Sequence, residues 1–364
     1  MKATLYERQI PLETPFITAL RRVDAVDDIV LKLEVDGEVG YGSASPTKAI
    51  TNDDRERIIR ETLKLLPIVK AEVENKTSLL SIDKALKNYT NSVSSRYMIM
   101  TALYDLFGNI ERCSVIDYFS FSFKAQLESD ITISLDTPDK MKSDALKAVK
   151  KGYKFLKLKV GGNWKLDVER LLNIQEVLKK DTQLRLDANQ AWSDKEAIKI
   201  INDLEKYHLN IDLIEQPTPA SDFSALKRVK ENTPFPIMAD ESVFNLEDAL
   251  RLIETKSADI INIKLAKCGG FYEALKIAES AKQEGLSCMI GCMMEGPIGM
   301  VAASQFAASQ DVITRYDLDC PMLYKKQIGE YSTKFNNNLI TVIPAFGLGI
   351  NSPDLSKEDI ICTM

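Results

Sequence analysis

Two lysines and three carboxylates stand at matching places in a series of predicted strands. Lys157 and Lys159 alternate with apolar residues at the period of two that is typical of a β-strand, so their ammonium groups lie on one face. Asp187, Glu215 and Asp240 end three later apolar runs and are spaced 28 and 25 residues apart. This pattern predicts that lysines and acids meet at one end of a sheet.

Three carboxylates that meet at one place repel one another unless a cation holds them together. Each acid alone would be a helix cap or a solvated group, but the joint pattern favours a shared ion. Hard oxygen ligands on short, rigid strands suit an octahedral divalent cation, with Mg²⁺ first. The sequence therefore predicts one Mg²⁺ per subunit, bound by Asp187, Glu215 and Asp240.

Lys264 stands on a further predicted strand, on the side of the three acids opposite to Lys159. A lysine acts as a base only when neutral, so its pKa must fall, and a neighbouring cation has this effect. Lys157 and the metal ion are such neighbours. The predicted chemistry is abstraction of a proton next to a metal-bound carboxylate, through an ene-diolate, with one lysine on each face of the reacting carbon.

The elements that position these residues recur about every 25 residues from residue 130 onward, with helical segments between β-rich runs. Strands that alternate with helices form a parallel sheet, and eight such units predict a (β/α)8-type barrel, with a doubly wound sheet as the alternative. In such barrels the chemistry lies at the C-terminal ends of the strands. The expected strands are Ile131–Leu135, Phe155–Val160, Leu184–Ala188, Leu213–Gln216, Ile237–Asp240, Ile260–Leu265, Cys288–Gly291 and Ile313–Asp317.

The first hundred residues form a different, α+β region. Residues 1–45 are expected to be strands, and three helices follow them. Within this region, residues 12–22 lack alternation and contain Pro15, which favours a loop. Arg21 and Arg22 in that loop would either be solvated or clamp a carboxylate, and local sequence leaves both readings open.

Composition is that of a globular protein with a sizeable core, since 45% of the 364 residues are hydrophobic and 27% are charged. The net charge of −6 argues against a nucleic-acid partner. The N-terminus lacks the apolar core of a signal peptide and no run has the length of a membrane span, so we expect a cytoplasmic protein without a membrane partner. The single histidine, His208, argues against histidine-ligated zinc and serine–histidine hydrolysis.

The chain resembles the enolase superfamily, specifically its muconate-lactonising subgroup, over nearly its whole length. The resemblance implies a (β/α)7β TIM-like barrel over residues 126–320. An α+β N-terminal capping domain over residues 1–125 would precede it, and a C-terminal segment over residues 321–364 would return to complete the cap. The motifs that carry the resemblance are Lys157-x-Lys159, Asp187-x-Asn189, Glu215-Gln216-Pro217, Asp240-Glu241-Ser242 and Lys264.

The resemblance also implies a role for each of these residues. The mandelate-racemase branch of the superfamily uses a barrel histidine as its base, and His208 lies outside any predicted strand end. The implied roles are Mg²⁺ ligation by Asp187, Glu215 and Asp240, acid–base catalysis by Lys159 and Lys264, neutralisation of the substrate carboxylate by Lys157, and support from Asn189 and Glu241.

Asp317-x-Asp319 places two carboxylates on one face of the last strand, which suits an ammonium group. The pair resembles the signature of dipeptide epimerases, where it binds the N-terminal amine of the dipeptide. Arg21 matches a loop arginine that contacts the glutamate side chain in L-Ala-D/L-Glu epimerases. Cys292 is expected to contact substrate at a position where serine is frequent in the family, and Ser43 stands where glutamate is common.

These resemblances predict a Mg²⁺-dependent dipeptide epimerase, in the first place an L-Ala-D/L-Glu epimerase, that works by 1,1-proton transfer at the C-terminal residue. They also imply a homo-oligomer and a place in the metabolism of peptidoglycan peptides. Two alternatives stay open. One is a lyase that uses the same lysines, such as o-succinylbenzoate synthase or a muconate cycloisomerase-type enzyme, whose substrates lack the cation that Asp317 and Asp319 would bind. The other is a non-catalytic metal- or ligand-binding protein on the same scaffold.

Overall fold

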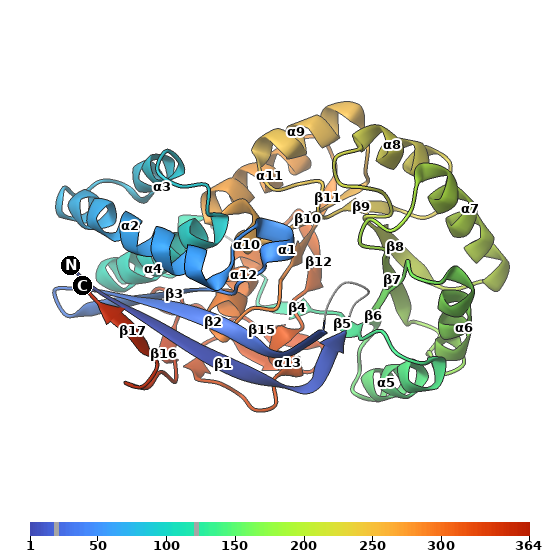
Figure 1. Cartoon of the computed structure of the whole chain (residues 1–364), viewed down its shortest axis with the longest axis horizontal. Helices are drawn as coiled ribbons and strands as arrows, with labels where there is room; N and C mark the ends of the chain where they lie inside the picture. The colour runs from blue at the N-terminus through green and yellow to red at the C-terminus, as the bar shows by residue number, and fades with distance from the viewer. Residues whose placement is uncertain (18–21, 120–123) are drawn as a thin grey trace.

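A barrel of eight parallel strands forms the larger part of the computed structural model (Figure 1). The structure describes residues 1–17, 22–119 and 124–364. Strands that are neighbours in the sheet are also consecutive in sequence, and a helix lies between each pair, which confirms the predicted (β/α)7β barrel. The strands are β5 (Ile131–Ile133), β6 (Phe155–Lys159), β7 (Gln183–Asp187), β8 (Ile211–Glu215), β9 (Ile237–Ala239), β10 (Ile260–Ile263), β11 (Ser287–Gly291) and β12 (Ile313–Asp317).

The connecting helices begin at polar residues that satisfy the first backbone N–H groups. Thr137, Ser193 and Asp222 each accept a backbone N–H three residues further along the chain. These helices cover the outside of the barrel (Figure 1). They are α5 (Pro138–Lys150), α6 (Trp164–Gln175), α7 (Asp194–Leu204), α8 (Phe223–Glu231), α9 (Leu246–Thr255), α10 (Leu265–Cys268), α11 (Phe271–Gln283) and α12 (Pro297–Ser309), with the 3₁₀ turn η2 (Glu205–Tyr207) after α7.

The strand register brings the predicted chemical residues to one level of the barrel. Lys159 of β6 pairs with Asp187 of β7, which in turn pairs with Glu215 of β8. Asp240 directly follows β9, and Lys264 directly follows β10. Because parallel strands share one direction, all five side chains lie at the C-terminal mouth of the barrel.

The barrel closes where β5 meets β12. Asp130 N–H donates to Tyr316 O at 3.1 Å, and Leu318 N–H donates to Ser129 Oγ at 2.9 Å. A side chain supplies a further link, because Thr132 N–H donates to the Asp319 carboxylate at 2.7 Å. Asp319 therefore joins the first barrel strand to the segment that follows the last one.

A four-stranded antiparallel sheet and a helical layer form the capping region, as the α+β reading of the N-terminus predicts (Figure 1). The sheet has the order β17-β1-β2-β3, so the last strand of the chain pairs with the first. The elements are β1 (Lys2–Ile17), β2 (Arg22–Val35), β3 (Glu38–Ala44), α1 (Lys48–Thr51), α2 (Arg55–Glu74), α3 (Leu79–Lys87), α4 (Val93–Glu111), η1 (Val115–Tyr118) and β17 (Ile360–Thr363).

The loop expected at residues 12–22 is wrong for residues 12–17, which belong to β1, and for Arg22, which begins β2. The ladder between β1 and β2 is interrupted between Pro11 and Phe16, so Pro15 lies where no N–H is needed for pairing. Further along, Ile17 O accepts from Leu135 N–H at 3.0 Å, which attaches the end of β1 to the barrel. The irregular sequence thus marks an irregular strand that reaches the barrel mouth.

The C-terminal segment after β12 packs on both parts of the chain. Its β15 pairs with β4, which precedes the barrel, and its β17 completes the capping sheet. The expected division at residues 125/126 and 320/321 stays a prediction. No helix in the described part of the chain has the length and hydrophobicity to cross a membrane. The remaining elements are β4 (Gln126–Glu128), α13 (Cys320–Leu323), β13 (Glu330–Tyr331), β14 (Lys334–Asn336), β15 (Leu339–Thr341) and β16 (Ile350–Ser352).

The contact between β3 and α4 gives a stability prediction. A Cβ at Gly42 would lie 1.9 Å from Met98 O and 2.7 Å from Ala102 N, both backbone atoms of α4. Gly42→Ala must push the strand away from the helix, so we expect the free energy of unfolding to fall by about 1–3 kcal/mol. Urea denaturation measures this change. A matched Gly162→Ala variant, whose Cβ meets no atom within 4 Å, should stay within about 0.5 kcal/mol of wild type, and equal losses in both variants would refute the close-approach explanation.

Candidate active site

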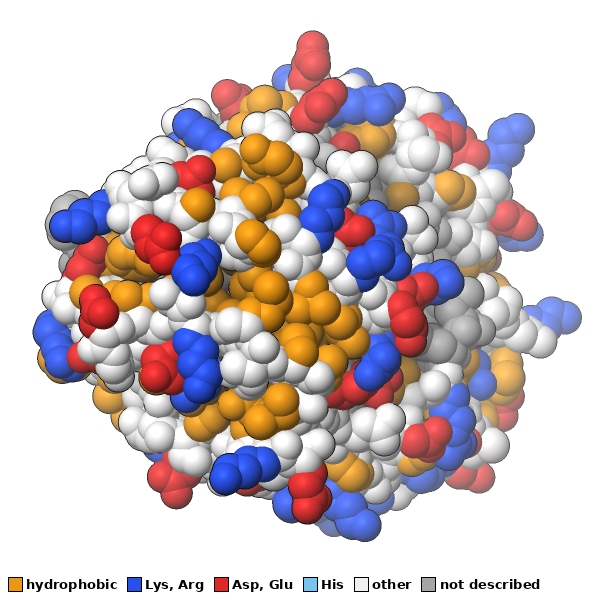
Figure 2. Space-filling model, turned by 60° about the vertical axis from the view of Figure 1, so that its left-hand side comes forward, with side chains coloured by type: hydrophobic (Ala, Val, Ile, Leu, Met, Phe, Trp, Pro, Cys, Tyr) orange, Lys and Arg blue, Asp and Glu red, His pale blue; other side chains and the backbone are white. Residues whose placement is uncertain are grey.

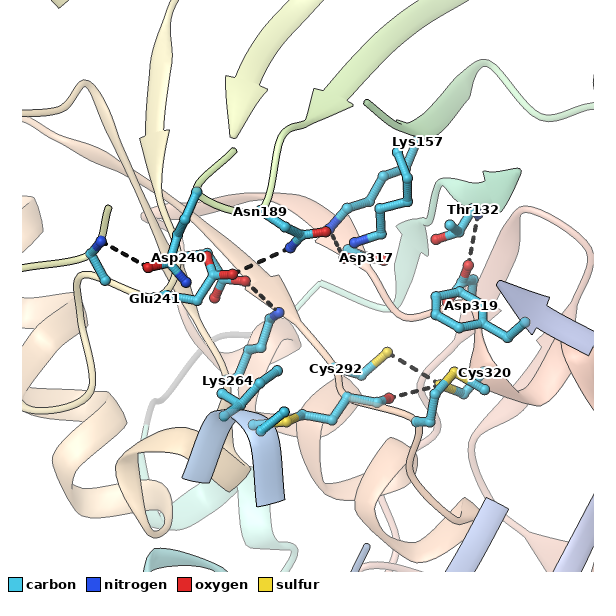
Figure 3. A pocket seen from close by; sticks show the side chains of 18 of the residues that line it. Thr132, Lys157, Asn189, Asp240, Glu241, Lys264, Cys292, Asp317, Asp319 and Cys320 are labelled. Carbon is cyan, nitrogen blue, oxygen red and sulfur yellow. Dashed lines mark hydrogen bonds and ion pairs between the residues drawn. The ribbon is translucent and has the colours of Figure 1, made fainter. Parts of the chain in front are cut away.

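A cavity of about 310 Å³ opens at the C-terminal mouth of the barrel. In Figure 3, Asp240, Glu241 and Lys264 lie on one side of it, and Asp319 and Cys320 lie on the other. Phe16 of β1, together with Ala49 and Ile50 of α1, brings the capping region to the same cavity. The predicted site residues that line it are Lys157, Lys159, Asn189, Asp240, Glu241, Lys264, Cys292, Asp317 and Asp319.

The three acids predicted to bind metal are almost fully buried, and lysine ammonium groups lie between them. Lys157 Nζ lies 2.7 Å from Glu215 Oε2 and 3.2 Å from Asp187 Oδ2. Asp187 Oδ2 also receives the Lys159 ammonium at 2.6 Å. The two lysines of β6 therefore supply the positive charge beside Asp187 and Glu215.

Asp240, the third acid, has its own cations. Lys264 Nζ lies 2.7 Å from Asp240 Oδ2, and the buried Lys267 binds Asp240 Oδ1. Burial opposes the charge on Asp240, but the two lysines outweigh it and hold the pKa of Asp240 below its ordinary value. In return, burial alone would lower the pKa of Lys264, but Asp240 keeps it above its ordinary value.

The pKa values of the other two acids diverge. Burial opposes ionisation of Asp187, but Lys159 and Lys157 overcome it and lower the pKa to about 2. Burial and the neighbouring Asp187 raise the pKa of Glu215 to about 7. The lysines thus stabilise the charged forms of Asp187 and Asp240, but they do not fully compensate the burial of Glu215.

The donor set of Asp187, Glu215 and Asp240 fits a hard divalent cation. Glu215 Oε2 is buried and has no hydrogen-bond partner among the described residues, so its only compensation is the ion-pair contact with Lys157. The other oxygen, Glu215 Oε1, accepts from Asn262 Nδ2 at 2.9 Å, which orients the carboxylate. Glu215 is therefore held in a fixed orientation, and its Oε2, which contacts Lys157, is suited to bind a metal ion.

A second group of acids lies closer together. One carboxylate oxygen from each of Asp130, Asp317 and Asp319 lies within 4.8 Å of the others. Asp130 pairs with the buried Arg185 at 2.7 Å, although burial and the neighbouring Asp317 still hold the pKa of Asp130 above its ordinary value. The cavity does not separate the two groups, because Asp240, Asp317 and Asp319 line it and Asp187, Glu215 and Asp130 do not. We favour the trio of strand-end acids as the metal site because its members stand at matching ends of three consecutive parallel strands.

Asp317 and Asp319 also line the cavity, and in Figure 3 Asp319 lies on the side away from Asp240 while Asp317 lies between them, beside Lys157. Asp317 binds Lys157 at 2.7 Å, and this lysine outweighs burial to lower the pKa of Asp317. Burial and the charge of Asp317 raise the pKa of Asp319 to about 6. Asp317 has one lysine partner and Asp319 accepts a backbone N–H from Thr132, so the pair can bind one more cation.

The structure places three of the remaining predicted site residues at the cavity and does not describe the fourth. Cys292 lines the cavity, and Asn189 Nδ2 donates to Glu241 at 3.3 Å, which holds two of the predicted supporting side chains together. Arg21 lies outside the described residues. Its neighbour Arg22 forms an exposed ion pair with Asp24 at 2.8 Å.

Two residues of the site escaped the sequence reasoning. Lys267 is buried against Asp240, and Asn262 positions Glu215. Their spacing from Lys264 could have identified both residues. Asn262 stands two residues before Lys264, on the same face of the strand. Lys267 stands three residues after Lys264, on the same side of the short helix α10. His208 is exposed at the end of η2, before β8 begins, as expected for a residue outside the chemistry.

Comparison with known proteins agrees with this geometry. The family model described as enolase C-terminal domain-like matches residues 140–354. The chain is 41% identical over 346 residues to the L-Ala-D/L-Glu epimerase of Clostridium acetobutylicum, a match that covers 94% of this chain and 95% of that protein.

The chain belongs to the enolase superfamily.

Solved structures of this superfamily resemble the chain along its whole length. The substrate-liganded L-Ala-D/L-Glu epimerase from Bacillus subtilis is 35% identical with a TM-score of 0.91, and the match covers 97% of this chain and 99% of that one. The dipeptide epimerase from Enterococcus faecalis V583, complexed with Mg and L-Leu-L-Tyr, is 34% identical with a TM-score of 0.89, over 96% and 98% of the two chains. This superfamily member therefore shares both barrel and capping region with those enzymes.

The two acid groups give a metal-binding prediction. We expect Mg²⁺ to raise the free energy of unfolding of the wild-type protein, by about 2.7 kcal/mol at a hundredfold excess over the dissociation constant. Glu215→Gln should lose this increment, because it removes a charged ligand of similar size. Asp130→Asn should retain it. Thermal unfolding with and without Mg²⁺ measures the increment within each variant, and the reverse result would place the ion in the Asp130 group.

Proposed function

We propose that this chain is a Mg²⁺-dependent dipeptide epimerase, an isomerase that interconverts L-Ala-D-Glu and L-Ala-L-Glu at the C-terminal residue. One observation carries the proposal: Asp317 and Asp319 line the same cavity as Lys159 and Lys264. An ammonium receptor and a pair of candidate bases thus face one small ligand. The names of the similar enzymes support the same substrate class.

In this proposal Asp187, Glu215 and Asp240 hold Mg²⁺. When bound, the ion supplies positive charge beside the substrate carboxylate and thereby makes the adjacent Cα–H more acidic. Asn262 and Lys267 position two of the acids from behind, through contacts with Glu215 and Asp240. Such contacts to metal ligands keep the site in order.

Lys159 and Lys264 act as the two acid–base residues. Each is bound to a carboxylate of the trio, Lys159 to Asp187 and Lys264 to Asp240. A divalent cation held by these carboxylates would supply positive charge beside both ammonium groups, and Lys159 and Lys264 would move the proton at the substrate Cα. One lysine then removes the α-proton from one isomer, and the other returns a proton to the opposite face.

Asp317 and Asp319 bind the N-terminal ammonium of the dipeptide. Asp317 ends β12 and Asp319 lies beyond the strand, yet one carboxylate oxygen of each lies within 4.8 Å of the other. Lys157 Nζ contacts Asp317 and Glu215 at 2.7 Å each and Asp187 at 3.2 Å, and it lines the cavity, where it would meet the substrate carboxylate. The dipeptide would therefore span the cavity from β12 to the strand-end acids.

The finer parts of the proposal concern the side chain of the substrate's C-terminal residue, the cellular role of the enzyme and its oligomeric state. Arg21 would contact the glutamate side chain of the substrate, and Cys292 would line the substrate pocket. The enzyme would act on peptidoglycan peptides in the cytoplasm, and copies of the chain would associate. Hydrophobic side chains grouped among charged ones in Figure 2 support association. Light scattering of the purified protein and a dipeptide library assayed for exchange test assembly and specificity.

The two lysines give the first prediction of this mechanism. In ²H₂O, wild-type protein with Mg²⁺ should incorporate deuterium at the C-terminal Cα of both L-Ala-L-Glu and L-Ala-D-Glu. Lys264→Ala should lower epimerisation by on the order of 10²–10⁴-fold but still exchange the isomer whose proton Lys159 removes. Lys159→Ala should show the opposite preference. Proton NMR and mass spectrometry follow both reactions.

The exposed Lys227, paired with Glu231, offers a matched control, and Lys227→Ala should behave as wild type. Retention of the Cα proton during wild-type turnover would rule out the proton-transfer mechanism. Dehydration or lactonisation without dipeptide exchange would support the lyase alternative instead.

The ammonium receptor gives a second prediction. Asp319→Asn should lower kcat/KM for L-Ala-L-Glu by on the order of 10- to 100-fold, because a charge-assisted hydrogen bond is lost. N-acetyl-L-Ala-L-Glu, which lacks the ammonium, should be a poor substrate for both proteins and show no comparable difference. Asp311→Asn, at an exposed acid paired with Lys282, is the control. An Asp319→Asn enzyme with unchanged kinetics would refute the assigned contact.

A further inference from the structure

Two thiols and a carboxylate meet at the edge of the cavity, and the proposed reaction uses neither sulfur chemically. Cys292 directly follows β11, and Cys320 opens α13 beyond the end of the adjacent strand β12. Their Sγ atoms lie 3.5 Å apart (Figure 3). A carboxylate oxygen of Asp319 and both sulfur atoms all lie within 4.8 Å of one another.

The two sulfur atoms are in non-bonded contact, at a separation that two thiolates on one cation can keep. A disulfide requires about 2.05 Å between the sulfur atoms. Two thiolates on a tetrahedral zinc ion, each at about 2.3 Å, lie roughly 3.8 Å apart, close to the observed separation. We infer that Cys292, Cys320 and Asp319 form a binding site for a soft divalent cation of the Zn²⁺ or Cd²⁺ class, distinct from the Mg²⁺ site.

The surroundings support a cation at this place. All three side chains line the cavity, so a bound ion would keep a fourth position open to water or a ligand. Cys320 Sγ–H donates to Met293 O at 2.9 Å, a bond that orients the free thiol and that the thiolate would give up on binding a metal ion. Asp317, on the same wall of the cavity, adds negative charge. Soft thiolates select zinc-like ions, whereas the all-oxygen trio of Asp187, Glu215 and Asp240 suits Mg²⁺.

The chemical balance of binding is simple. Each thiol gives up its proton to solvent and forms one sulfur–metal bond, so an ion releases two protons and no electron is transferred. Reduced thiols are therefore required. The six cysteines of the described chain are unpaired in disulfides, which meets this condition.

Occupation of the site would exclude substrate, a consequence that rests on the proposed function. Asp319 cannot bind both a metal ion and the ammonium of a dipeptide. A zinc-like ion and a dipeptide with an N-terminal amine are thus mutually exclusive ligands, while Mg²⁺ and the zinc-like ion are not.

Co²⁺ titration of the reduced protein at saturating Mg²⁺ tests the site without reference to activity. Wild-type protein should bind one Co²⁺ with a thiolate-to-metal charge-transfer absorption band and release two protons. Cys292→Ser and Cys320→Ser should each abolish or strongly weaken the band. Cys113→Ser, at a partly exposed thiol of the capping region, should retain it. The Mg²⁺-dependent rise in thermal stability, recorded for each variant, shows that the barrel is folded.

Absence of the band in wild-type protein, or its survival in a folded Cys292→Ser, Cys320→Ser double variant, would overturn the inference. Adding L-Ala-L-Glu should displace Co²⁺ and reduce the band, whereas N-acetyl-L-Ala-L-Glu should not. If the dipeptide binds, as thermal stabilisation would show, but leaves the band unchanged, the claim of exclusion fails and the proposed function stands. If no dipeptide binds, the proposed function fails while the band still reports on the thiol site.

Discussion

The site depends on buried carboxylates that cannot all be charged without nearby cations. Asp187, Glu215 and Asp240 are at most 3% exposed, so almost no water reaches them. Lys157, Lys159, Lys264 and Lys267 supply the compensation in the structure, through ion pairs with all three acids. Because burying an unpaired charge is costly, lysines and acids must be placed together, and the strand register achieves this. A divalent cation bound by the same acids would compete with these lysines for the carboxylate oxygens.

Much of this arrangement follows from the sequence, because parallel strands impose a simple geometry. The period of two at Lys157 and Lys159 places both lysines inside the barrel mouth, and equal strand lengths then align Lys159 with Asp187 and Glu215. The eight strands and their order follow from the alternation with helices. The strand periodicity is local and the alternation of strands with helices repeats along the chain, so the residue pattern is sufficient to predict both.

Other features depend on contacts between distant segments, which no local pattern reveals. The sequence suggests that the pKa of a base lysine is lowered, yet Asp240 holds that of Lys264 above its ordinary value until another cation takes the acid. Residues 12–17 continue a strand because the barrel accepts their backbone, despite Pro15. The link from Thr132 to Asp319 closes the barrel across 187 residues, and the same carboxylate also lines the cavity. The thiol pair of Cys292 and Cys320 likewise appears only once β11 and β12 lie side by side.

A crystal structure of the protein with Mg²⁺ and L-Ala-L-Glu tests the central assignment most directly. We predict an ion bound jointly by Asp187, Glu215 and Asp240, Lys159 and Lys264 on opposite faces of the C-terminal Cα, and the ammonium at Asp317 and Asp319. An ion at Asp130, Asp317 and Asp319, or a dipeptide with both lysines on one face of its Cα, would contradict it.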